Sequence, residues 1–320
     1  MIRYIIRRVL WGIVLLILVS ALTFLFFYVF PTADPAVLRA GRNASPAQIE
    51  FIRKELGLNL PIYTQFFHYM KNIFLHFNFG YSYYSQQSVL SLIGDRLPPT
   101  ISLTVGAVVL WLLAGIPIGI ISAIYRGRVV DRLSMGGALL FVSMPVFWFG
   151  LLVLFLFAND IGKFPIFPGA GSYVGLTVDP VKWFTALILP WIVLAGTQAA
   201  IYSRLMRGGL LDIMGEDYIR TARAKGLRER RVIWRHGVRS AITPVLTVLG
   251  IDIGGLLGGA VVTETVFAIH GIGLLNYQAI LHSDFPIVQG TVLLAALFII
   301  VFNIIVDIAY AYLDPRVRYS

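Results

Sequence analysis

The stretch ISLTVGAVVLWLLAGIPIGIISAI, residues 101–124, contains no charged side chain. A helix of this length spans the roughly 30 Å hydrocarbon core of a bilayer. Five further stretches are similarly long and mainly apolar, at 9–30, 136–158, 183–205, 241–262 and 287–312. The sequence therefore predicts an all-α membrane protein with six transmembrane helices, the first of which is an anchor rather than a removable signal peptide.

The overall composition supports this fold class. Hydrophobic residues make up 58% of the 320 positions and charged residues 13%, whereas soluble domains carry roughly 25% charged residues. The chain has no cysteine, which excludes disulfides and thiolate metal sites. The formal net charge of +10 could suggest a nucleic-acid partner, but its meaning depends on where the charges lie relative to the bilayer.

The basic residues gather on one side of the predicted spans. The 204–239 loop holds ten Lys and Arg against four acidic residues, and both termini and the 125–135 loop are also basic. On the other side, 31–97 and 159–182 are nearly balanced and 263–286 has no Lys or Arg. The positive-inside rule places the basic segments in the cytoplasm. We therefore expect a multi-pass cell-membrane protein with both termini cytoplasmic and no nucleic-acid partner.

The external segment 31–97 predicts a small helical insertion between the first two spans. In SPAQIEFIRKELGL, residues 45–58, Ser45 and Gln48 form a capping box and Gly57 supplies the helix stop. A second helix follows Pro61, and its expected buried face consists of Phe66, Phe67, Met70, Ile73 and Phe74. The alternative is an amphipathic belt anchored by interfacial tyrosines. The expected units are helix 1 at 1–30, the insertion at 31–97, and a five-helix core at 98–320 with a cytoplasmic loop at 206–239.

Known catalytic patterns are absent from the sequence. There is no G-x-x-x-x-G-K-[ST] phosphate loop and no G-x-S-x-G nucleophile elbow. The five histidines show no metal-ligand spacing. We therefore expect no catalytic residue, no metal site and no cofactor bound by this chain.

Two acidic residues lie within predicted spans, where ionisable groups are costly. Asp252 either lines a polar translocation path or forms a structural hydrogen bond between helices, and the sequence leaves both open. Asp307, nearer the cytoplasm, is expected to pair with an arginine. The candidate path residues are Asp252, Gly255 and Glu264.

Glycines in two spans predict close helix packing. Gly250, Gly254 and Gly258 recur at four-residue spacing in the fifth span, and such rows let helix backbones approach one another. Gly115 and Gly119 in the second span favour the same interpretation.

The basic loop contains DYIRTARAKGLRERRVIWRH, residues 217–236. Acidic residues at its start and basic residues near position 225 favour a short helix over 216–225, which Gly226 would end in the left-handed conformation. Tyr218, Thr221 and Ala222 would share a face on which another surface could seat closely. Attraction to anionic lipid is the alternative explanation of the charge. Lipid attraction does not explain the acidic helix start or the glycine stop.

Within this loop, GEDYIRTARAKGL, residues 215–227, resembles the EAA loop of permease subunits of ABC importers, in the form used by the dipeptide, oligopeptide and nickel group. The general motif has Glu-Ala-Ala where this chain has Arg220, Thr221 and Ala222. Its proline also follows the motif glycine more closely, whereas the next proline after Gly226 here is Pro244. The resemblance covers nearly the whole chain, and the stretches that carry it are MIRYIIRRVL, SPAQIEFIRKELGL, DRLPPTISLT, GGAVVTETVFAIHGIG, DFPIVQG and YLDPRVRY.

The resemblance implies a half-channel for short peptides. It would pair with a second homologous permease, lie in membrane lipid, bind two ATPase subunits that hold ATP and Mg²⁺, and receive cargo from an extracytoplasmic binding protein. The implied ATPase-coupling residues, with Arg223 as the preferred force-bearing one, are Glu216, Asp217, Tyr218, Thr221, Ala222, Arg223, Ala224, Lys225, Gly226 and Leu227. Three alternatives are import of nickel or another small solute, an ion-coupled secondary transporter with Asp252 as relay, and a membrane scaffold.

Overall fold

The computed structural model describes residues 2–30, 34–41 and 44–313, which form helices and no named β-strand. Four helices are long and apolar enough to cross a membrane, and up to six spans result if each of two bent helix pairs counts as one. The four are α1 (Ile2–Phe24) with its π-helical continuation η1 (Leu25–Val29), α5 (Val89–Ile124), α8 (Pro180–Met214) and α15 (Phe285–Leu313). An all-α membrane fold is therefore confirmed, while the count of six is one reading of the bent pairs.

The expected span at 136–158 is not one continuous helix. It is divided into α6 (Val129–Ser143) and α7 (Val146–Phe157), which meet at 101°. Pro145 explains the break, because proline lacks an N–H and disfavours helical backbone in the residue before it. Met144 accordingly has an extended conformation, with ψ at 124°.

The expected span at 241–262 is also interrupted. Its main helix, α12 (Thr243–Leu257), bends by 44° from the preceding helical run. That run consists of α10 (Glu229–Arg231), η2 (Val232–Val238) and α11 (Arg239–Ala241). After Leu257 the chain turns at Gly259, whose φ is +125° and whose added Cβ would lie 2.4 Å from the Gly273 Cα. Two short helices follow, α13 (Val261–Val266) and α14 (Ile272–Leu281).

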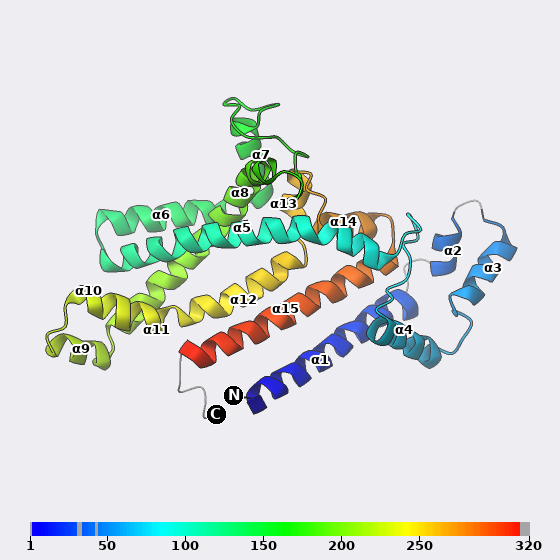
Figure 1. Ribbon diagram of the computed structural model, residues 1–320, viewed down its shortest axis with the longest axis horizontal. Helices are drawn as coiled ribbons and strands as arrows, with labels where there is room; N and C mark the ends of the chain where they lie inside the picture. The colour runs from blue at the N-terminus through cyan, green and yellow to red at the C-terminus, as the bar shows by residue number, and fades with distance from the viewer. Residues whose placement is uncertain (1, 31–33, 42–43, 314–320) are drawn as a thin grey trace.

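Close packing at the glycine rows is confirmed. A Cβ on Gly254 would lie 2.6 Å from the Ile299 Cα, so α12 touches the backbone of α15. A Cβ on Gly119 would lie 2.5 Å from the Ser203 carbonyl oxygen, so α5 touches α8 in the same way. Figure 1 shows α1, α12, α15 and α5 extending together along the long axis of the molecule.

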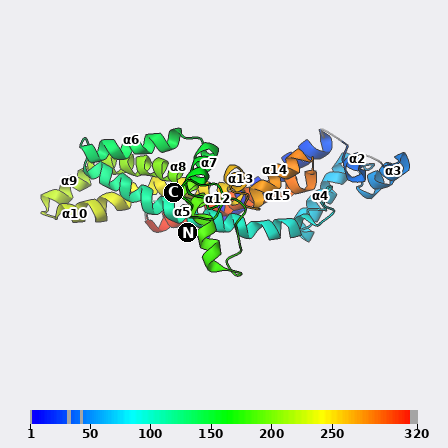
Figure 2. The same ribbon diagram turned by 90° about the horizontal axis from the view of Figure 1, so that it is seen from above.

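The insertion consists of α2 (Pro35–Ala40), α3 (Pro46–Glu55) and α4 (Ile62–His76). The capping box of Ser45 and Gln48 is confirmed, and Gly57 has the expected left-handed φ of +69°. Figure 2 shows these helices at one end of the molecule and α10 at the other.

The expected buried face of α4 is partly wrong. Ile73 is buried, but Phe67 is 66% exposed. The face that packs against α1 includes the expected Phe66 and also Tyr69, whose ring centroids lie 5.2 and 5.5 Å from that of Phe24.

Helix α5 begins at Val89, well before the apolar stretch at 101–124. It continues through Pro98 and Pro99, so residues from 89 onward belong to a core helix although the sequence placed 89–97 in the insertion.

At the other end of the core, the expected arginine partner of Asp307 is Arg8, with Nε 2.9 Å from Oδ2. This ion pair connects the start of α1 to α15.

Candidate functional site

The basic loop folds into a short, well-defined unit after α8, here called the α9 unit (residues 215–232). Glu216 precedes α9 (Asp217–Ala224), and Gly226 follows it with φ at +73°. The Gly226 N–H donates to the Arg223 carbonyl at 2.9 Å and the Leu227 N–H to the Ala222 carbonyl at 3.4 Å. This pair of bonds is the Schellman pattern of helix termination. The predicted helix and its glycine stop are therefore confirmed.

The inner side of α9 packs against its own chain. Ile219, Ala222 and Val232 form a buried cluster, covered by Ile213, Met214 and Leu227. Ala222 was expected to share the docking face with Tyr218 and Thr221. That expectation is wrong, because Ala222 lies three residues after the fully buried Ile219 and occupies the same inner side. The cluster attaches α9 to the end of α8.

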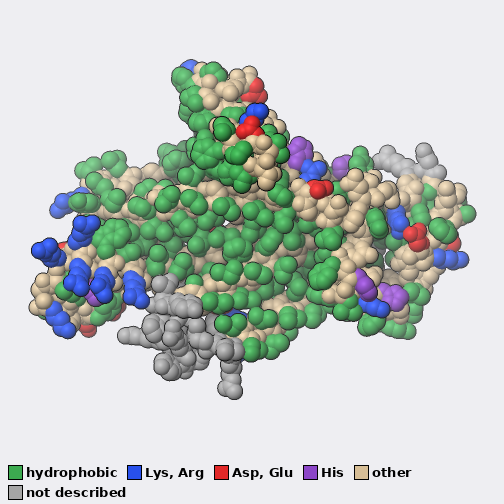
Figure 3. All heavy atoms as spheres, viewed as in Figure 1, with side chains coloured by type: hydrophobic (Ala, Val, Ile, Leu, Met, Phe, Trp, Pro, Cys, Tyr) green, Lys and Arg blue, Asp and Glu red, His purple; other side chains and the backbone are tan. Residues whose placement is uncertain are grey.

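The outer side of α9 is exposed. Tyr218 is 43% exposed, and the Thr221 hydroxyl donates to the Asp217 carbonyl at 2.9 Å. The other exposed candidate residues are Glu216, Asp217, Arg223, Ala224, Lys225 and Gly226, while Leu227 is half-buried. Figure 3 shows Lys and Arg side chains gathered at this end of the molecule. The exposed ones in this region are Arg204, Arg220, Arg223, Lys225, Arg228, Arg230, Arg231, Arg235 and Arg239.

Arg223 has a partner within the chain. Its Nε and Nη2 atoms lie 3.1 and 2.7 Å from the two Glu229 carboxylate oxygens, a bidentate arrangement that joins α9 to α10. The hydrogen bonds to Glu229 raise the pKa of Arg223 above its ordinary value. The sequence did not indicate this partner, because a six-residue separation across a glycine turn follows no helical spacing rule.

A second ion pair connects α8, the helix that leads into the α9 unit, to α6. Arg207 on α8 donates from Nε and Nη2 to Asp131 of α6, at 2.7 and 2.8 Å. Asp131 also accepts from the Ser122 hydroxyl at 2.5 Å and the Gly127 N–H at 2.8 Å, and its side chain is 6% exposed. This cluster joins α5, α6 and α8. Sequence reasoning missed it, although Asp131 is the lone acid of the basic 125–135 loop.

Asp252 on α12 accepts a hydrogen bond from the Tyr202 hydroxyl of α8 at 2.8 Å. The structural hydrogen bond between helices that the sequence allowed is therefore present. An added Cβ on Gly255 would meet no heavy atom within 4 Å among the described residues. Asp252 is only half-buried, so its role on a translocation path, like that of Gly255, stays a prediction.

Glu264 does not join these two residues. Its side chain is fully buried and accepts from the Thr100 hydroxyl at 2.9 Å and the Leu274 N–H at 2.8 Å. The carboxylate thus connects the α13–α14 turn to α5. Because the chain encloses it completely, the structure argues against the expectation that Glu264 lines a path.

Comparisons with known proteins agree with this architecture. Residues 115–319 match the family described as "Binding-protein-dependent transport system inner membrane component". Residues 1–104 match "Binding-prot-dependent transport system membrane comp, N-term". The chain therefore belongs to the family of inner membrane components of binding-protein-dependent transport systems. It is a multi-pass membrane protein and a permease component of an ABC importer.

Two relatives within this family align with nearly the whole chain. The chain is 42% identical over 316 residues, 99% of both chains, to a protein of Brucella abortus (strain 2308) whose description reads "Putative peptide transport system permease protein". It is 40% identical over 320 residues, 100% of both chains, to the glutathione transport system permease protein GsiC of Escherichia coli (strain K12).

Proposed function

We propose that this chain forms half of the translocation pathway for short peptides in an ATP-driven importer. Two relatives that align over nearly their whole length are described for peptide and for glutathione transport, and glutathione is itself a tripeptide. This favours a short-peptide cargo over nickel. Membership in a binding-protein-dependent family likewise disfavours a secondary transporter that works alone.

The α9 unit is the observation that carries the proposal. It presents the exposed side of α9 to a partner, while the buried cluster attaches α9 to α8 and the Arg223–Glu229 pair attaches α9 to α10. A partner that moves α9 therefore moves α8 directly and α12 through η2 and α11. We assign this partner as one of two ATPase subunits, which would hold ATP and Mg²⁺.

The connection continues into the core. Tyr202 on α8 and Asp252 on α12 are hydrogen-bonded, so the helix before the α9 unit and the first long helix after it are also joined directly. In this account ATP binding closes the ATPases, displaces α9, and tilts α8 and α12 against a second, homologous permease. Hydrolysis resets them.

The orientation follows from the positions of the charged segments. Figure 1 shows α9 at one end of the long axis and the insertion at the opposite end, with the start of α1 and the end of α15 both directed away from the insertion. We place the basic end in the cytoplasm and the insertion outside, where an extracytoplasmic binding protein delivers cargo.

Transport by the reconstituted complex tests the proposal. Proteoliposomes would contain this chain, its partner permease and the ATPases, with the binding protein added on the external face. We expect uptake of a labelled dipeptide or tripeptide only with ATP and binding protein present. Uptake driven by an ion gradient without the ATPases, or uptake of Ni²⁺ but no peptide, would contradict it.

A further inference from the structure

A cavity with both polar and apolar walls lies far from the α9 unit, where the insertion meets the core helices. Its volume is about 240 Å³. Its walls come from the end of η1, from α4, from the 78–83 segment and from the first turns of α15. Arg39 of α2 and Glu55 of α3 also line it. No candidate coupling or path residue is among its lining residues.

The two sides of the cavity are fixed by hydrogen bonds within the chain. On one side, the Tyr69 hydroxyl of α4 lies 2.9 Å from the Thr23 hydroxyl of α1. On the other side, buried Asp284 accepts from the Ser82 hydroxyl at 2.5 Å and from the Tyr83 N–H at 3.0 Å. The cavity is therefore preformed.

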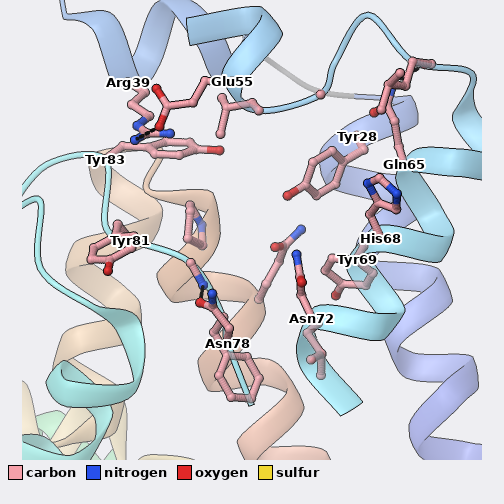
Figure 4. A pocket seen from close by; sticks show the side chains of 18 residues that line it. Tyr28, Arg39, Glu55, Gln65, His68, Tyr69, Asn72, Asn78, Tyr81 and Tyr83 are labelled. Atoms are coloured by element: carbon pink, nitrogen blue, oxygen red, sulfur yellow. Dashed lines mark hydrogen bonds and ion pairs between the residues drawn. The ribbon is translucent and has the colours of Figure 1, made fainter. Parts of the chain in front are cut away.

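Four tyrosines and four amide side chains are among the eighteen residues that line the cavity. Figure 4 shows one wall with Tyr28, His68, Tyr69 and Asn72, and a facing wall with Arg39, Glu55, Tyr81 and Tyr83. Such side chains offer hydrogen-bond donors, acceptors and apolar ring faces together. Sites of this kind accept small polar organic molecules.

Gln289 on α15 supplies the most direct sign of a ligand. It lines the cavity, is 5% exposed, and its Nε2 atom has no hydrogen-bond partner among the residues that the structure describes. A buried amide nitrogen without an acceptor is unfavourable, and native structures contain few of them. A carbonyl or carboxylate oxygen of a ligand would satisfy it once the amide turns toward the cavity.

The charges on the cavity wall are of both signs. Arg39 Nη2 lies 3.0 Å from Glu55 Oε1, and the two side chains are 24% and 48% exposed. This contact occupies one of the five guanidinium donors. Partly exposed ion pairs contribute little to stability, so a ligand can replace this contact at small cost. The wall thus offers a cation and an anion side by side, which complements a ligand that carries both charges.

We propose that this cavity binds a small zwitterionic molecule, a free amino acid or a dipeptide. The ligand carboxylate would contact Arg39, its ammonium Glu55, and a carbonyl or carboxylate oxygen Gln289 Nε2. The volume of about 240 Å³ is below the roughly 300–1,000 Å³ of sites for drug-sized ligands, which limits the occupant to one or two amino-acid residues. The dipeptide form rests on the proposed cargo, whereas the amino-acid form does not.

Direct binding tests the proposal. The permease pair with its ATPases, in lipid nanodiscs without ATP or binding protein, would be titrated with labelled L-alanine, dialanine, and dialanine blocked at both ends. We expect saturable binding of a zwitterion and at least about tenfold weaker binding of the blocked peptide. If alanine binds more tightly, the ligand is a free amino acid; if dialanine binds more tightly, the ligand is a dipeptide. No saturable binding, or equal binding of the blocked peptide, overturns the inference.

Variants locate the ligand. Gln289→Leu should weaken binding about tenfold, whereas Gln278→Leu, at an exposed position of α14, should leave it unchanged. If Gln289→Leu does not assemble, Arg39→Gln should abolish the preference for dialanine over its C-terminal amide, and Glu55→Gln the preference over its N-acetyl form. Unchanged preferences in both variants refute the assignment.

The same experiments separate this inference from the proposed function. Absence of zwitterion binding, together with ATP-dependent peptide uptake, removes the cavity site only. Binding of alanine in the cavity of a complex that imports no peptide removes the cargo proposal only.

Discussion

Reversing the charge of Arg223 tests whether this side chain positions α9 or contacts the ATPase directly. The bidentate pair with Glu229 has short contacts, but its side chains are 42% and 53% exposed. Exposed pairs contribute about 0.2–1 kcal/mol. At the upper end of that range, Arg223→Glu should weaken binding of the ATPase subunit about fivefold. The effect stays small because the buried cluster around Ile219 still holds α9.

The double variant Arg223→Glu with Glu229→Arg restores opposite charges and should return affinity to within about twofold of the parent protein. Affinity would be measured on the detergent-solubilised permease pair at low salt and at about 0.5 M salt, where screening should reduce the effect of the single variant. Arg126→Glu makes the same change of charge outside the α9 unit and serves as the control. A loss far beyond tenfold in both the single and double variants would refute the positioning role and place Arg223 in the interface.

Three further predictions concern the helix contacts. Gly254→Ala should lower the unfolding temperature, because the added Cβ meets the α15 backbone and overpacking costs about 1–3 kcal/mol. Gly255→Ala serves as the matched control, because an added Cβ there has open space. Asp131→Asn should also lower it, since the Arg207 guanidinium loses its charged partner, and an unchanged midpoint would contradict a stabilising role. Asp252→Asn keeps an acceptor oxygen for its tyrosine partner and should leave ATP-driven uptake largely intact. Loss of uptake with normal assembly and ATPase activity would instead indicate a direct role on the path.

Local signals in the sequence predicted local structure well. The capping box at Ser45 and the helix stops at Gly57 and Gly226 depend only on neighbouring residues, and all three are present. The glycine row of α12 predicted close packing because its four-residue spacing defines one helix face, although it did not indicate which helix packs there.

Hydropathy located the apolar segments but not their shape. Averaging over a window cannot register the change of direction at Pro145, so a helix pair bent by 101° was expected to be one span. The same averaging placed the start of α5 too late, because Asp95 and Arg96 lower the apolar content of a turn that is nevertheless helical.

Contacts between residues far apart in the sequence were the part of the site that the sequence predicted least. Asp131 and Arg207 lie 76 positions apart, and no periodicity relates them. Ala222 looked suitable for docking because it is small, but the burial of Ile219 decided which side of α9 faces inward. Such assignments require the three-dimensional packing of α8 against α9 and η2.

Cross-linking at α9 tests the central claim most directly. Because this chain has no cysteine, an introduced one is its single thiol, and the parent chain in the same complex measures the background from the other subunits. Tyr218→Cys places a thiol on the exposed side of α9, and Lys182→Cys places one at a 71% exposed position at the start of α8. In the assembled transporter, a thiol-to-amine reagent should join Tyr218→Cys, but not Lys182→Cys, to an ATPase subunit. An intact complex in which Tyr218→Cys forms no such adduct would contradict the assignment of α9 as the docking helix.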